Sequence, residues 1–113
     1  MKLLIEVYGQ LLSMDFAAID ALKTAITKAM DTPPRAKVAE ASVVGIIQAR
    51  FLGLCLVIKA ANQQITIQAE DVPILQAALT NAGAVLNVPS TTETPTGDIV
   101  VMCYAPLEEI SPP

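Results

Sequence analysis

Residues 40–67, EASVVGIIQARFLGLCLVIKAANQQITI, decide the fold that this sequence predicts. The stretch is rich in Val and Ile, and Gly53 stands where a turn between two strands can form. We therefore divide the stretch into two strands, residues 41–50 and 54–60. Residues 65–67 either extend the second strand or form a short strand of their own.

A strand and a helix are expected before this stretch. Residues 2–8 alternate loosely between apolar and other residues and end at Gly9, which is the pattern of a strand closed by a turn. Ser13 is a candidate N-cap for a helix that ends before Pro33 and Pro34. The apolar stripe of this helix has three- and four-residue spacing and consists of Phe16, Ile19, Leu22, Ile26 and Met30.

A second helix follows the β-rich stretch. Asp71 is expected to cap it, Pro73 lies in its first turn, and Gly83 suits the left-handed position that ends a helix. A flexible polar loop is expected from Pro89 to Gly97, before a last strand at residues 98–105.

The resulting element order is βαββαβ, and it predicts one α+β domain over residues 1–113 with an irregular tail at residues 106–113. This order is the ferredoxin-like arrangement, a four-stranded antiparallel sheet with two helices on one face. No internal repeat with a period of 20–50 residues stands out.

Composition indicates self-association. Hydrophobic residues make up 53% of the chain and charged residues 16%, against about 45–50% and about 25% in ordinary soluble domains. A domain of this size has too few interior positions for that many aliphatic side chains, and the uncovered face of the sheet carries few charges. We therefore expect a homo-oligomer, with a trimer or a hexamer favoured.

Other partners are disfavoured by charge and hydropathy. A membrane partner is not expected, because the longest charge-free run, residues 72–92, is interrupted by Gln76, Asn81, Asn87 and two prolines. Glu6 interrupts the apolar start and argues against a signal peptide, which places the chain in the cytoplasm. The net charge is −4 and the seven basic residues are scattered, so nucleic acid is not an expected partner.

The residue types needed for common catalytic and cofactor sites are scarce. The chain has no His, and its glycines form no phosphate-binding motif. The adjacent carboxylates at residues 70–71 and 108–109 are more typical of a cap and a solvated surface than of a metal site. Cys55 and Cys103 lie in apolar runs and are expected to be buried thiols. No cofactor or metal is predicted, and a non-catalytic role is favoured over an enzyme.

Three residues form a candidate ligand-binding set. Arg50 and Lys59 are single cations on mostly apolar strands, where they either bind an anionic small molecule or protect a sheet edge. Tyr104 ends the last strand and Tyr8 ends the first, so the two aromatic rings are expected near one rim of the sheet.

Several segments resemble the bacterial microcompartment shell domain, a ferredoxin-like module that tiles as hexamers or pseudohexameric trimers. The similar segments are residues 4–9 (LIEVYG), 16–21 (FAAIDA), 43–45 (VVG), 53–58 (GLCLVI) and 71–72 (DV). The sequence departs from that family by four extra residues before the first helix and by the extra segment 62–69. Residues 49–52 (ARFL) replace the small polar pore loop of that family.

The leading functional hypothesis is a non-catalytic, homo-oligomeric structural or assembly module, which the resemblance describes as shell-like. The first alternative is a regulatory protein that senses an anionic small molecule bound between subunits near Arg50 and Lys59. The second alternative is a small isomerase or lyase that uses Lys59, Glu6 or Tyr104 as an acid or base at a subunit interface.

Overall fold

The computed structural model describes residues 1–31 and 42–105, which contain two α-helices and eight strands. Two short 3-10 helices, η1 (Phe16–Ala18) and η2 (Ala69–Asp71), lead into α1 (Ile19–Asp31) and α2 (Val72–Asn81). The strands are β1 (Lys2–Val7), β2 (Gln10–Asp15), β3 (Ser42–Val44), β4 (Ile47–Leu52), β5 (Cys55–Ala60), β6 (Gln63–Gln68), β7 (Ser90–Glu93) and β8 (Asp98–Tyr104).

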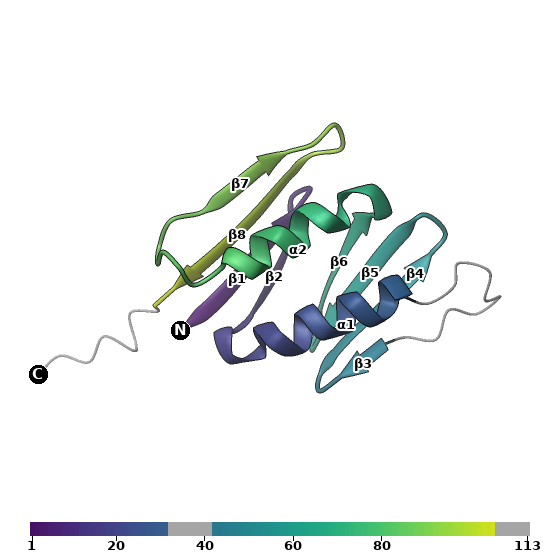
Figure 1. Ribbon diagram of the computed structural model, residues 1–113, viewed down its shortest axis with the longest axis horizontal. Coiled ribbons are helices and arrows are strands. Elements are labelled where there is room, and N and C mark those ends of the chain that lie inside the picture. Colours follow the sequence, from purple (N-terminus) through teal and green to yellow (C-terminus); the bar gives the residue numbers. More distant parts are fainter. Residues whose placement is uncertain (32–41, 106–113) are drawn as a thin grey trace, which may run out of the picture.

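The strands form two four-stranded antiparallel sheets that lie side by side behind the two helices (Figure 1). The first sheet has the order β2-β1-β8-β7, and the second has the order β3-β4-β5-β6. Helix α2 packs on β8 of the first sheet, whereas α1 packs on β3 and β4 of the second. We call the sheet face toward the helices the inner face and the opposite face the outer face.

The chain contains an internal repeat with an offset of 53 residues, from Lys2 to Cys55. Strands β1 and β2, η1 and the start of α1 correspond without a gap to β5, β6, η2 and the start of α2. Each sheet combines the first hairpin of one half with the last hairpin of the other half. The sequence showed no repeat with a period of 20–50 residues, and the observed offset is just longer than this range. The two copies share a pattern of strands more than they share residue identities.

The core is one continuous cluster that fills the space between the helices and both sheets. Strand β1 shows how the sequence builds it, because its residues alternate between partly exposed and buried along the strand. The largest fully buried side chains are Leu3, Ile5, Leu12, Leu22, Ile26, Ile47, Leu56, Ile58, Ile65, Ile67, Leu75 and Leu79.

Two glutamine side chains join the sheets where β2 lies beside β6. The side-chain amide of Gln10 donates to the backbone oxygen of Thr66 at 2.9 Å, and the backbone N–H of Thr66 donates to the Gln10 Oε1 at 3.0 Å. Gln63 makes the same pair of bonds with the backbone of Ser13, at 2.8 and 2.7 Å. Each side chain thus takes the place of a strand backbone, and the edge-facing N–H and C=O groups of Ser13 and Thr66 are satisfied.

The α+β class, the antiparallel pairing and the two helices on one face are confirmed. The single four-stranded sheet with βαββαβ order is wrong, because the described residues form eight strands in two sheets. Ser13 is not an N-cap but a residue of β2, and residues 65–67 belong to the separate strand β6. Strand β7 lies inside the loop expected from Pro89 to Gly97, whereas the tail at residues 106–113 lies outside the described residues.

Candidate functional site

The structure brings together two of the three predicted ligand-binding residues. Arg50 on β4 and Lys59 on β5 are exposed on the outer face of the second sheet. Arg50 pairs with Val57 and Lys59 pairs with Gln48, so the two cations are diagonal neighbours on adjacent strands. Tyr104 lies on β8 of the other sheet. Anion binding at Arg50 and Lys59 stays a prediction.

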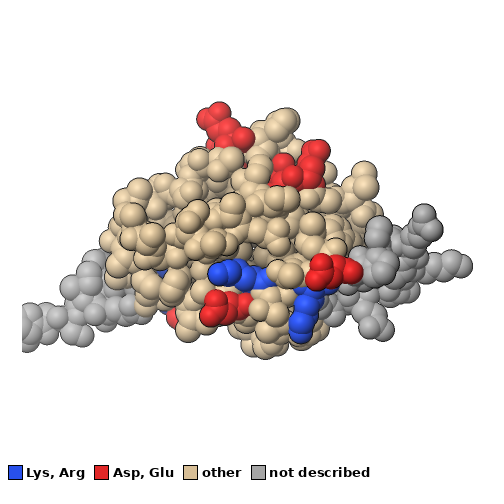
Figure 2. Space-filling model, viewed as in Figure 1, with Lys and Arg blue, Asp and Glu red and all other residues tan. Residues whose placement is uncertain are grey.

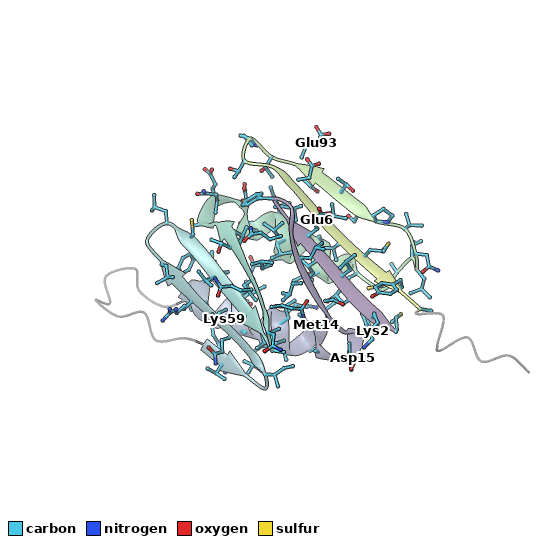
Figure 3. The ribbon with its side chains drawn as sticks, turned by 180° about the vertical axis from the view of Figure 1, so that it is seen from behind. Lys2, Glu6, Met14, Asp15, Lys59 and Glu93 are labelled. Atoms are coloured by element: carbon cyan, nitrogen blue, oxygen red, sulfur yellow. The ribbon has the colours of Figure 1, made fainter. Side chains whose placement is uncertain are left out.

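The expected proximity of Tyr8 and Tyr104 is wrong. Strands β1 and β8 are antiparallel, and Tyr104 pairs with Lys2 at the start of β1, whereas Tyr8 follows the end of β1. The two aromatic rings therefore lie at opposite ends of the sheet. Lys59 and Glu6, offered as acid or base groups of one enzyme, lie on different sheets within one copy (Figure 3).

A partly buried cluster that the sequence did not reveal is centred on Tyr8. The Tyr8 hydroxyl donates a hydrogen bond to Asp71 and accepts one from the backbone N–H of Gln68 at 3.2 Å. Asp71 is only 5% exposed and is the one buried charged residue in the described part of the chain. Burial raises the pKa of Tyr8 to about 12, and the hydrogen bond to Asp71 acts in the same direction.

This cluster links the end of β1 to the β7–β8 turn and to the start of α2. The backbone N–H of Tyr8 donates to the Asp98 oxygen at 2.9 Å, and the Tyr8 ring packs against Gly97 of the β7–β8 turn. The repeat places Ala61 at the position equivalent to Tyr8 and Ala18 at the position equivalent to Asp71. The hydrogen bond between Tyr8 and Asp71 therefore has no equivalent at the repeated positions, and we interpret its role as structural.

A pocket of about 270 Å³ lies between the end of α2, the loop after it and the start of β7. Its lining is mostly aliphatic and includes Ala82, Val85, Val88 and Val101. Cys103 also lines the pocket, is 1% exposed and has a pKa raised by burial. Both cysteines are free thiols; Cys103 is buried as expected, and Cys55 is partly exposed.

Within residues 1–31 and 42–105, two strand edges remain open. Among the described residues, no strand pairs with the outer side of β3 or of β7, which end the two sheets. We call β3 with its turn Gly45–Ile46 the β3 edge, and β7 with the preceding loop 85–89 the β7 edge. Exposed large aliphatic side chains gather at both: Val43 and Ile46 at the first, and Val85, Leu86 and Val88 at the second.

Charges on the outer face differ between the two sheets. The first sheet carries Glu6, Glu93 and Asp98, and in addition the ion pair of Lys2 with Asp15, whose N···O distance is 2.7 Å. The hydrogen bond from Lys2 lowers the pKa of Asp15. The second sheet carries Arg50 and Lys59, and Lys59 occupies the repeat position equivalent to Glu6 (Figure 3). One half of the outer face is thus acidic and the other basic.

On the helical face, charges of both signs gather in the lower part of the view, where α1 lies (Figure 2). The two helices are too short or too polar to cross a membrane, as judged over residues 1–31 and 42–105. Within these same residues no group of three or more Cys, Asp or Glu side chains is placed to hold a metal ion. No family model, curated protein or solved structure matches the chain.

Proposed function

We propose that this chain is a non-catalytic structural module that assembles with copies of itself. The observation that carries the proposal is the pair of open strand edges, each bordered by exposed aliphatic side chains. An open strand presents unpaired N–H and C=O groups, which form a template for another strand. Pairing with strands of other copies would satisfy the N–H and C=O groups of both edges.

The edges carry few of the charges that protect edge strands against pairing, although both strands are short and Pro89 precedes β7. Proteins that stay monomeric commonly place lysines, inward charges or bulges on edge strands. The three residues of β3 are Ser-Val-Val, and β7 contains Glu93 as its single charged residue. The exposed aliphatic residues beside both strands add apolar surface, which marks contact sites between chains.

The proposed assembly contains three or more copies in the cytoplasm. Two free thiols suit a reducing compartment. The resemblance to microcompartment shell domains supports a trimeric or hexameric tile, although the two-sheet architecture differs from the expected ferredoxin-like sheet. A tile of this kind acts through its surface and needs no catalytic group.

Size-exclusion chromatography with light scattering tests the proposal. We expect masses that are multiples of the 11.9 kDa chain and that rise with protein concentration over the micromolar range. The proposal is contradicted if the protein elutes at the mass of a single chain at every concentration.

A further inference from the structure

We propose that copies join head to tail, with β7 of one copy pairing in antiparallel fashion with β3 of the next. This inference rests on the proposed self-association and names the surface that produces it. It predicts one continuous strand layer that runs through successive copies.

The hydrogen-bond pattern of each hairpin identifies the groups that face the joint. Thr94 and Gly97 bond to each other at 3.0 and 3.2 Å, which makes them a bonded pair at the end of the β7–β8 hairpin. Bonded and non-bonded pairs alternate along an antiparallel ladder, so Thr91 directs its N–H and C=O away from β8. The two-residue turn Gly45–Ile46 makes Val44 and Ile47 the bonded pair at β3, and Val43 then faces the open side.

Strand directions favour an antiparallel joint. Gln10 contacts Thr66 while Gln63 contacts Ser13, so β2 and β6 run in opposite directions where the sheets meet. All other neighbouring strands are antiparallel. Directions therefore alternate from β7 to β3, and these two edge strands run in opposite directions. A neighbouring copy with the same face outward brings an antiparallel partner to each edge.

One alignment of β7 against β3 of the next copy pairs the backbone N–H and C=O groups that face the joint. When Thr91 lies opposite Val43, both residues offer an N–H and a C=O to each other and form a bonded pair. The same register places Val88 of one copy beside Ile46 of the next. Ile46 is 69% exposed, and Val88 lines the pocket of about 270 Å³. The joint thus brings an exposed aliphatic side chain to an apolar pocket.

The same register also aligns opposite charges. Glu93 follows Thr92, which this register pairs with Ser42 of the next copy. In that next copy Ser42 pairs with Ala49, and Arg50 follows Ala49. Both side chains are on the outer face, in one row and two strands apart, which is about 10 Å and within reach of a Glu and an Arg side chain. Pairing β7 with a second β7 instead puts two acidic sheets side by side, each with Glu93 and Asp98 on its outermost strands, which is unfavourable.

Two proline variants test the joint. Thr91→Pro removes the N–H that faces the joint on the β7 edge, and Val43→Pro does the same on the β3 edge, without removing a bond inside either hairpin. We expect each variant alone to sediment as a single chain and an equimolar mixture to form a dimer, because each variant keeps the edge that the other lacks. Thr91→Ala and Val43→Ala keep the N–H and are the matched controls, and circular dichroism checks that all four variants fold.

A charge exchange tests the register without proline. Glu93→Arg and Arg50→Glu should each weaken association by about two- to fivefold, and the double variant should restore it, since each joint then holds the same two opposite charges with their positions exchanged. If the proline variants still associate as the wild type does, or if one of them alone does so, the head-to-tail joint is wrong while self-association stands. If the wild type sediments as a single chain, self-association itself fails.

Discussion

The Tyr8 hydroxyl lies between a buried carboxylate and a backbone N–H that belong to the other half of the chain. Sixty-three residues separate Tyr8 from Asp71 along the sequence. No local pattern marks such a pair, and the sequence placed Asp71 only as a helix cap. Asp71 does stand at the N-cap position of α2, but the structure shows no capping hydrogen bond from its side chain.

Tyr8→Phe should lower the free energy of unfolding at neutral pH by about 1–3 kcal/mol, because Asp71 stays buried without its donor. Urea unfolding measures the change. An unfolding free energy equal to that of the wild type would show that Asp71 finds another donor, and would contradict the stabilising role of the Tyr8–Asp71 hydrogen bond.

The same bond makes stability depend on alkaline pH. The folded pKa of Tyr8, about 12, lies above the ordinary value of 10.0, so its contribution is fully present below about pH 10 and is lost as pH rises toward 12. Stability of the wild type should fall more steeply across this window than that of Tyr8→Phe. Equal slopes in the two proteins would contradict the account.

At the scale of elements, the glutamine bridges decide how the two hairpins β1–β2 and β5–β6 meet. Gln10 and Gln63 are equivalent positions of the repeat, and each bonds to the strand that the other begins. The bridges occupy part of the edges of β2 and β6, which lie beside each other. Within the described residues, β3 and β7 are then the sheet edges with no neighbouring strand.

Gln63→Ala should cost about 1–3 kcal/mol of folding free energy, since the Ser13 backbone groups lose both partners. Gln64→Ala is the control, because Gln64 is exposed on the outer face of the same strand and should change stability by less than about 0.5 kcal/mol. Chemical denaturation compares the two variants. Equal losses would show that the bridge contributes nothing.

The strands with dense apolar runs were predictable, whereas β2 and β7 were not. Strands β1, β5 and β8 were expected near their observed bounds because their Val, Ile and Leu residues stand out from the surrounding sequence. Strand β7 has four polar residues, and β2 contains Ser13, which the sequence reads as a helix N-cap. Because β2 and β7 were not predicted, the sequence indicated one four-stranded sheet where the structure has two.

Of the candidate site, the sequence singled out Arg50 and Lys59, which lie on adjacent strands, but did not identify the open edges. An edge is defined by the order of strands in the sheet, and strand order is a property of long-range pairing. The excess of aliphatic residues was visible in the composition. Their position beside β3 and β7 required the fold.

At the scale of the whole molecule, the repeat gives two similar ends that carry different surfaces. Equivalent positions hold Glu6 and Lys59, and the two outer edges belong to an acidic and a basic sheet. A molecule with two unlike, complementary ends forms a heterologous contact, which continues into a ring or a filament. A symmetric dimer would leave one end of every copy open.

Native mass spectrometry of the wild-type protein tests this claim most directly. The account predicts assemblies of three or more copies, either as one closed ring or as a ladder of increasing masses. A population that stops at two copies, or at the single chain of 11.9 kDa, would contradict it.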